Sequence, residues 1–375
     1  MKKITSCAVI ILLCLTLGGC YDSNDVTDLA FIIAIGIDTA EDEMYEFTFQ
    51  SIKPSAFGSN SSGENPLISS SVMSHTIYDA MDIINTNISE KCDYSQLKLV
   101  VFSKSVLKNG IEKPINAMLK SNDFHPNIRI AMSETTASEY LKKVSPSLDT
   151  NPAEYYENIF KNKFSTFSPD AKLKDFEKTD KNNANVVPAV YVNGKIGLKN
   201  ELVSDNVSGM AILNNYKLID TANPDEVFIY RLITDRNFRG NYYVTMPDKK
   251  ENIVIEIIKK DAKYNLTHTK NGLSVLYNIA LEGDISWSEY SNKYLADDLE
   301  LKKFVEQEIK NGILNFMQKC SSQYKTDILN IAKKAKPYYL TVNAWENENW
   351  QYIFESIKYN ANAEISIKRE GINLD

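Results

Sequence analysis

The residue types that most often perform catalysis or bind metals are widely separated in this 375-residue chain. Three histidines, a residue type that serves as general base or metal ligand, stand far apart at His75, His125 and His268. The chain holds no His-Glu-x-x-His, Cys-x-x-Cys, Gly-x-Ser-x-Gly, P-loop or Gly-x-Gly-x-x-Gly motif. We therefore predict no enzymatic activity. We assign no catalytic residue, no metal ligand, no cofactor-binding residue and no cofactor.

The carboxylates give no stronger signal. Three aspartates recur at intervals of three, at Asp22, Asp25 and Asp28. The glycine and the terminal glutamate of an EF-hand loop are missing around them, which favours a solvated tether over a cation site. The segments Glu282-Gly283-Asp284 and Asp235-Arg236 stand alone in the sequence and are predicted to be surface turns.

One residue, Cys20, stands at a sequence position where cysteine thiols are modified in a known way. Met1–Lys3 is a short cationic start, an apolar run follows to Leu17, and two glycines precede the cysteine. This pattern is typical of a secretory signal, and the apolar run is too short for a membrane-spanning helix. Leu17-Gly18-Gly19-Cys20 resembles the bacterial lipobox, in which the cysteine thiol is diacylated and the chain is cut just before it. We predict that Cys20 is lipidated, the alternative being an ordinary signal peptide with a chance cysteine.

The composition bounds the rest of the chain. About 355 residues follow Cys20, enough for two or three domains, with 43% hydrophobic and 24% charged residues overall. No second apolar run is long enough to span a bilayer, so acyl chains alone would attach the protein to a membrane. Loss of Lys2 and Lys3 with the signal would change the formal net charge from −7 to −9. An acidic chain without a basic run argues against nucleic-acid binding and against electrostatic attraction to anionic lipids.

The remaining thiols and the tryptophans are expected to pack. Cys7 and Cys14 would leave with the signal, so Cys92 and Cys320 are the cysteines left besides Cys20. Two buried free thiols are favoured, and a single long-range disulfide stays open. The tryptophans, which form no recognisable sugar-stacking or quaternary-amine motif, are Trp287, Trp345 and Trp350. The last two are expected to anchor the C-terminal core.

Apolar periodicity predicts strands and helices in mixed order, which favours an α+β fold with mixed sheets. The predicted strands are Leu29–Asp38, Tyr45–Ile52, Leu97–Ser103, Ile128–Met132, Val186–Val192, Gly209–Asp220 as a hairpin, Tyr242–Met246, Ile253–Lys260, Tyr264–Lys270, Leu273–Glu282 and Ala361–Arg369. The predicted helices are Thr76–Ile88, Ile111–Leu119, Ser138–Val144, Asp297–Cys320 and Asp327–Lys334. Pro54–Pro66 is predicted to be a loop.

The charged, asparagine-rich segment Lys172–Asn185 is the best candidate for a linker. With it we predict a signal peptide over 1–19, an N-terminal α/β domain over 20–185, a middle β-rich domain over 186–258 and a C-terminal α+β domain over 259–375.

Several short segments recur in a specific order along almost the whole chain. They are Cys20-Tyr21-Asp22, Leu29–Asp38, Gln96–Ser103, Val207–Leu213 with Lys217-Leu218, and Trp350 with Ile365–Gly371. In order and spacing they resemble the Ger(x)C family, the C subunits of the germinant receptors of endospore-forming bacteria. Tyr21 replaces the tryptophan usual in that family.

The resemblance implies a multi-domain α+β protein in which each mixed sheet is flanked by α-helices. It also implies a non-enzymatic lipoprotein needed for receptor assembly or signalling in spore germination. Such a subunit would be anchored through diacylated Cys20 on the outer face of the spore's inner (cytoplasmic) membrane, with integral-membrane A- and B-type subunits as partners. The alternative is a solute-binding lipoprotein of a membrane transporter. A surface hydrolase is disfavoured because nucleophile and metal motifs are missing.

Overall fold

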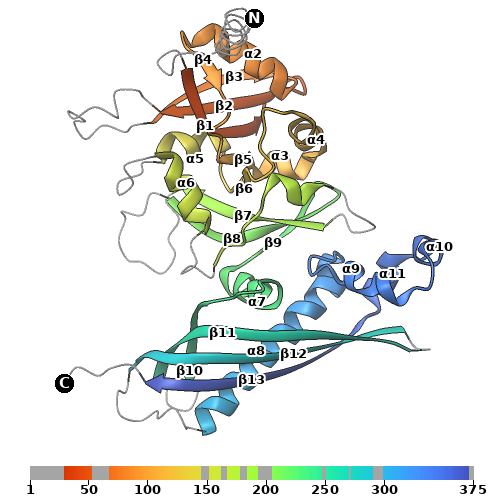
Figure 1. Cartoon of the computed structure of the whole chain (residues 1–375). Coiled ribbons are helices and arrows are strands. Elements are labelled where there is room, and N and C mark those ends of the chain that lie inside the picture. The colour runs from red at the N-terminus through yellow and green to blue at the C-terminus, as the bar shows by residue number, and fades with distance from the viewer. Residues whose placement is uncertain are drawn as a thin grey trace, which may run out of the picture.

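The computed structural model describes residues 29–52, 67–144, 152–161, 167–177, 184–192, 205–246, 251–269, 272–289 and 299–370. The signal segment, Cys20 and the predicted loop Pro54–Pro66 lie outside these residues. So do the three aspartates of the expected tether, Asp22, Asp25 and Asp28. Two β-sheets with their helices form an elongated molecule, the first sheet at the N-terminal end and the second at the other (Figure 1).

The first sheet is mixed. Its strands are β1 (Leu29–Thr39), β2 (Tyr45–Ile52), β3 (Leu67–Ser74), β4 (Lys91–Asp93), β5 (Leu99–Ser103), β6 (Arg129–Ser133), β7 (Ala184–Val192), β8 (Asp205–Asn214) and β9 (Lys217–Ala222). They lie in the order β3-β2-β1-β5-β6-β7-β8-β9, with β4 paired to the start of β1. The central strands β1, β5, β6 and β7 run parallel, while both flanks are antiparallel.

Helices cover both faces of this sheet, which explains the almost fully apolar central strands. One face packs against α2 (Ile77–Asn87), α3 (Lys104–Asn109), α4 (Glu112–Lys120) and a 3₁₀ turn over Leu173–Phe176. The other face packs against α5 (Ala137–Lys143) and α6 (Pro152–Lys161). At Gly36 of β1 a Cβ atom would lie 3.1 Å from the Cβ of Ala137, so the glycine lets α5 approach the strand closely.

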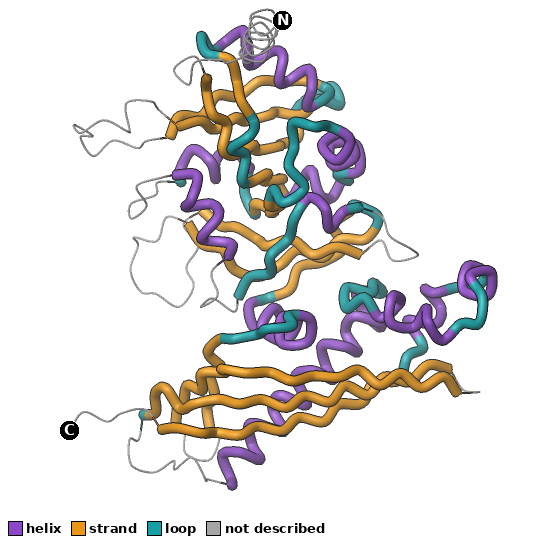
Figure 2. Tube along the Cα trace, viewed as in Figure 1, coloured by secondary structure: helices purple, strands orange, loops and turns teal. Residues whose placement is uncertain are grey.

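The second sheet has the order β10 (Gly240–Met246), β11 (Glu251–Thr269), β12 (Gly272–Ser288) and β13 (Lys358–Glu370). Only the β12–β13 pair is parallel in this sheet. The long helix α8 (Leu299–Lys319) crosses one face and buries a stripe running from Leu301 to Met317 (Figure 2). A π turn (Cys320–Tyr324), α9 (Ile331–Ala335), a 3₁₀ turn (Lys336–Tyr338), α10 (Val342–Glu346) and α11 (Trp350–Glu355) then lead to β13.

A shared core joins the two sheets around α7 (Pro224–Thr234). Met210 and Ile212 of β8 belong to the same buried cluster as α7, α8 and the second sheet. The helix begins at Asn223, whose side chain accepts from the Glu226 backbone N–H while the Glu226 carboxylate accepts from the Asn223 N–H. This capping box fixes the start of the connecting helix.

The α+β class with several mixed sheets is confirmed. The predicted helix Asp297–Cys320 is confirmed as α8, and the two predicted strands between Ile253 and Lys270 are one long strand, β11. The predicted linker Lys172–Asn185 is wrong at its start, because Leu173 and Phe176 are buried in the core beneath the first sheet. The boundaries 185/186 and 258/259 stay predictions, and both fall inside single strands, β7 and β11.

Candidate functional site

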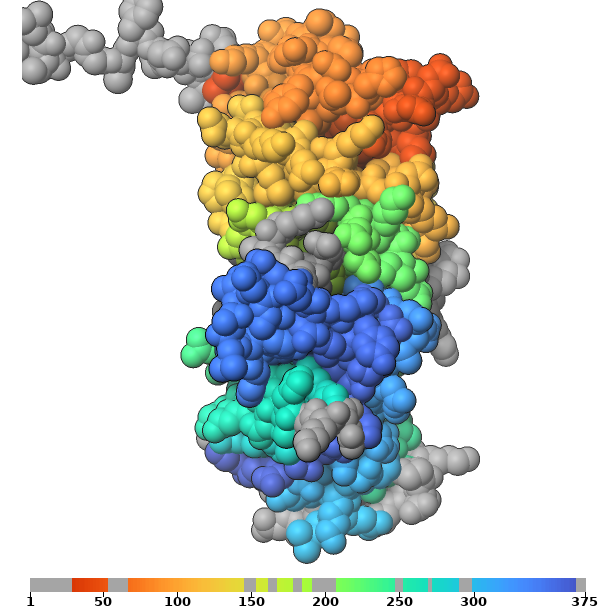
Figure 3. Space-filling view, turned by 90° about the vertical axis from the view of Figure 1, so that its right-hand side faces the viewer, coloured from red at the N-terminus to blue at the C-terminus, as the bar shows by residue number. Residues whose placement is uncertain are grey.

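The predicted lipid-attachment residue, Cys20, lies outside the described residues, but the point where its segment joins the folded body is defined. Leu29 opens β1 and pairs with Lys91 of β4. The N-terminal strands and helices occupy one end of the molecule, and the second sheet occupies the opposite end (Figure 3). The segment that carries Cys20 therefore enters at the end farthest from the second sheet.

The described part of the structure brings together neither a set of metal-ligand side chains nor the two cysteines Cys92 and Cys320. Among the described residues, no group of three His, Cys, Asp or Glu side chains has a geometry that could hold a metal ion. Cys92 and Cys320 are both free and buried, in different clusters, so they do not form the disulfide that the sequence left open. Burial raises the pKa of each thiol, which disfavours the reactive thiolate.

The prediction that Glu282-Gly283-Asp284 is a surface turn is wrong, because the segment lies within strand β12; Glu282 there and Asp235 at the end of α7 both have cation partners. The Glu282 carboxylate accepts from Lys368 at 2.5 Å and from Lys259 at 2.9 Å, and these hydrogen bonds lower its pKa. Asp235 accepts from Arg231 at 2.8 Å, one helical turn earlier. Both carboxylates are satisfied by cations, which leaves neither as a general acid or base.

Two buried aspartates hold helix ends. Asp38 accepts from the backbone N–H groups of Ala137 and Ser138, each at 2.8 Å, at the start of α5. Asp327 accepts from those of Ile331 at 2.9 Å and Ala332 at 2.7 Å, at the start of α9. Burial raises both aspartate pKa values, and the backbone donors oppose that rise. Their observed partners assign them a structural role.

Two lysines are half-buried on the core side of the second sheet. The Lys260 ammonium donates to the carbonyl of Leu232 at 2.8 Å, at the C-terminal end of α7. The Lys334 ammonium lies 3.2 Å from the centre of the Tyr264 ring, a cation–π contact. Burial lowers the pKa of each lysine to about 8.

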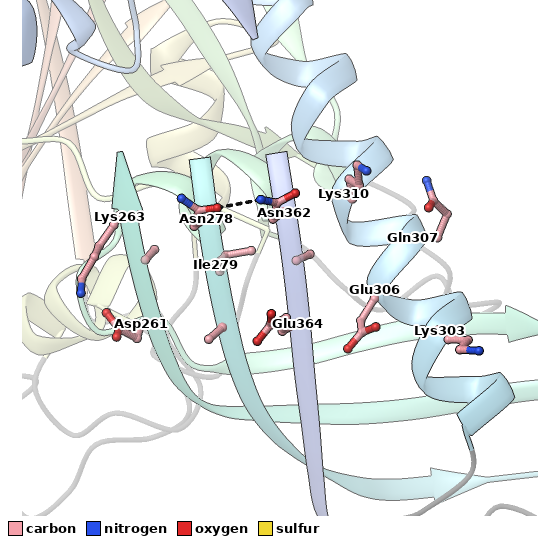
Figure 4. A pocket seen from close by; sticks show the side chains of 13 residues that line it. Asp261, Lys263, Asn278, Ile279, Lys303, Glu306, Gln307, Lys310, Asn362 and Glu364 are labelled. Carbon is pink, nitrogen blue, oxygen red and sulfur yellow. Dashed lines mark hydrogen bonds between the residues drawn. The ribbon is translucent and has the colours of Figure 1, made fainter. Parts of the chain in front are cut away.

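A groove of about 660 Å³ lies over the second sheet and beside α8 (Figure 4). Its polar lining includes Asp261, Lys263, Glu306, Lys310 and Glu364, with Asn362 donating to Asn278 at 2.9 Å. Figure 4 shows these side chains spread along β11, β12, β13 and α8 instead of converging on one point. Acidic and basic groups are mixed, and no nucleophile–base pair is formed. These features are those of a solvent-exposed polar surface.

No helix in the described part of the chain is long and apolar enough to cross a membrane.

Comparisons with known proteins find relatives along most of the chain. A family model described as the spore germination protein N-terminal domain matches residues 22–190. A second, described as spore germination B3/GerAC-like, C-terminal, matches residues 208–371. Strand β7 is at the end of the first matched region, and most of β8 is in the second. Because β7 and β8 pair, one β-sheet spans both matched regions.

Individual relatives span nearly full length. The chain is 20% identical over 366 residues to spore germination protein GerQC from Bacillus cereus, covering 94% of this chain and 95% of that protein. It is 22% identical over 404 aligned positions to spore germination protein KC from Bacillus subtilis (strain 168), covering 99% and 97%. The crystal structure of the GerBC protein aligns with a TM-score of 0.55 at 15% identity, covering 89% of this chain and 96% of that one, which establishes a similar fold.

Proposed function

The chain belongs to the spore germination protein family whose N- and C-terminal domain models match most of its length, and we propose that it is the lipid-anchored C subunit of a nutrient germinant receptor. The observation that carries the proposal is the combination of both domain matches with a lipobox-like Leu17-Gly18-Gly19-Cys20 directly before the first match. In this role the protein performs no reaction of its own.

The anchor would be diacylated Cys20, on the outer face of the spore's inner membrane. Nine residue steps separate Cys20 from Leu29, where the folded body begins, and an extended chain of that length reaches about 30 Å at most. The first sheet would therefore stay close to the bilayer. A tether this short raises the effective concentration of the body beside partners embedded in the same membrane.

The partners would be integral-membrane A- and B-type subunits, and the contribution of this subunit would be to assembly or signalling. Two features suit a scaffold: the first sheet continues across the two matched regions, and α7 packs into a core shared with the second sheet. A displacement at one sheet would then be transmitted to the other through packed side chains.

The alternative, a solute-binding lipoprotein of a transporter, has less support. Such proteins are usually built as two doubly wound lobes, whereas the second sheet here is three antiparallel strands plus one parallel strand, with α8 across one face. The groove beside α8 is lined by mixed acidic, basic and amide side chains of one sheet and one helix, which is not the cleft between two lobes that such proteins use.

Copurification tests the proposal. The full chain, tagged at its C-terminus, is isolated in mild detergent from spore membranes, and the bound proteins are identified by mass spectrometry. We expect multi-span A-type and B-type receptor subunits in stoichiometric amounts. Absence of both, together with tight binding of a free amino acid by the purified protein alone, would favour the transporter alternative.

A further inference from the structure

Two large aromatic side chains project from the face of the second sheet opposite α8. Tyr243 on β10 is 61% exposed, and Trp287 on β12 is 52% exposed. Both are directly paired with Val254 on β11, the strand between them. The register shifts by a β-bulge between Ile285 and Trp287, which lets Trp287 leave the core face on which Ile285 is buried, so that Tyr243, Val254 and Trp287 form one row, which we call the aromatic row.

The exposure of this row is a local feature. The other two tryptophans, Trp345 and Trp350, are 1% and 6% exposed, so Trp287 is the one that faces solvent. The residues next to the row along β11, Ile253 and Ile255, point to the opposite face and are buried in the core. One face of the sheet is therefore packed against the core, while the aromatic row on the other face is exposed to solvent.

Polar rows flank the aromatic row on both sides. On one side, Asn241, Glu256 and Asp284 are paired across the same three strands. On the other, the Thr245 hydroxyl donates to the Asn252 side chain at 2.8 Å. An apolar strip thus lies between amide, hydroxyl and carboxylate groups.

These groups define the chemistry of a ligand. Glu256 is exposed beside the aromatic row, and its carboxylate oxygens can accept from ligand hydroxyl groups. Glu256, Asp284 and the adjacent Glu289 make the platform locally negative, which disfavours phosphates and other anions. A ligand with apolar ring faces, many hydroxyl donors and no negative charge suits all three features.

The spacing of the aromatic side chains selects an extended ligand. Two strand spacings place Tyr243 and Trp287 about 10 Å apart at their backbones. A single cation cannot lie within about 6 Å of both ring centres unless the two rings close around it, so an aromatic cage for a quaternary amine is disfavoured. The separation matches roughly one disaccharide of a β-1,4-linked chain, whose alternate sugars present equivalent faces.

We propose that the aromatic row is a binding platform for an uncharged β-1,4-linked glycan. Sugar rings stack on Tyr243 and Trp287 across Val254, and hydroxyl groups along the glycan donate to Glu256. This site is independent of Cys20 and of the receptor partners. Its failure would leave the proposed function untouched.

The test uses the full chain in detergent and two soluble probes, the hexamer of β-1,4-linked N-acetylglucosamine and cellohexaose. Titration calorimetry is expected to detect saturable binding of at least one probe. A blue shift of tryptophan emission is expected to accompany it, because Trp287 leaves water when a sugar covers it. Trp287→Ala and Tyr243→Ala should each weaken binding about tenfold or more, and Trp287→Phe should retain most of it.

Tyr352→Ala is the matched control, because Tyr352 is 74% exposed but lies on α11, away from the row. It should bind as the unaltered protein does, and circular dichroism melting identifies any variant that has not folded. The proposal is overturned if neither hexamer binds, or if binding survives in both aromatic variants. It is also overturned if a lysine-rich peptide occupies the aromatic row while both glycans fail.

Discussion

Lys319 at the end of α8 and Glu226 in the first turn of α7 form an ion pair, with 2.5 Å between Nζ and Oε1. The pair is partly shielded, with side-chain exposures of 29% and 20%. It links the helix that covers the second sheet to the helix that leads out of the first. The Glu226 carboxylate also accepts from the Asn223 N–H, so one side chain closes the helix cap and joins the two parts of the molecule.

Glu226→Ala should lower the free energy of unfolding by about 1–3 kcal/mol, because it removes a cap and leaves a partly buried ammonium without its carboxylate. Urea denaturation of the full chain measures this. Lys325→Ala is the control: Lys325 lies 3.3 Å from Glu355 with 59% of its side chain exposed, and should cost under about 0.5 kcal/mol. Equal effects of the two substitutions would contradict the linking role of Glu226.

The two half-buried lysines, Lys260 and Lys334, each add a positive contribution to the dependence of stability on pH in mild alkali. Burial lowers the pKa values of Lys260 and Lys334 to about 8, below that of an exposed lysine. Between about pH 8 and pH 10 each lysine therefore binds more protons in the unfolded chain than in the folded one and contributes a rise of the free energy of unfolding with pH, which the raised pKa values of the Cys92 and Cys320 thiols oppose over the same range. Toward pH 10 and above, the raised pKa values of tyrosines, Tyr242 among them at about 12, add to that opposition.

Lys334→Met tests this slope. Urea unfolding measured at pH 7, 8, 9 and 10 should give a less positive slope of the free energy of unfolding against pH for the variant than for the unaltered protein, since one of the two lysines no longer titrates. Lys333→Met, at the exposed neighbouring position, should leave the slope unchanged. The same slope in the Lys334 variant as in the unaltered protein would refute the assignment.

Trp345 should be the most costly tryptophan to remove. It is 1% exposed and its ring contacts those of Tyr339 and Trp350, at centroid distances of 5.1 Å and 5.5 Å. Trp345→Ala should destabilise the protein by about 3–5 kcal/mol through lost burial and a residual cavity. Trp287→Ala, at the exposed position, should cost under about 1 kcal/mol in the same denaturation assay. The reverse order would show that the C-terminal helices do not pack as described.

Residues whose fate depends on local pattern were predictable from the sequence. The apolar run at Leu29–Asp38 is a central strand, and the stripe from Leu301 to Met317 faces the core, because burial follows from periodicity alone. Trp345 and Trp350 anchor the C-terminal core as expected. Helix α7 was missed although Asn223-Pro224-Asp225-Glu226 carries a complete capping signal, with a cap residue, a proline at the first position and a glutamate at the third.

Features that depend on strand pairing were not predictable. Glu282 acquires two lysine partners only because β11 and β13 flank β12, with Lys368 far away in the sequence. Trp287 gains its relationship to Tyr243 only through Val254 on the strand between. The linker prediction failed because a few apolar residues, Leu173 and Phe176, suffice to hold a polar segment against a core. The overall polar composition of the segment does not reveal these two buried residues.

The central claim is that Cys20 attaches a receptor subunit to the membrane, and one comparison tests it directly. Spores carrying Cys20→Ala in place of the unaltered protein are fractionated and triggered with nutrient, beside spores carrying Cys14→Ala, a cysteine substitution within the signal. We predict that Cys20→Ala is lost from the membrane fraction and that nutrient-triggered germination is strongly slowed, while Cys14→Ala behaves normally. A Cys20→Ala protein that still reached the membrane and supported germination unimpaired would contradict the account.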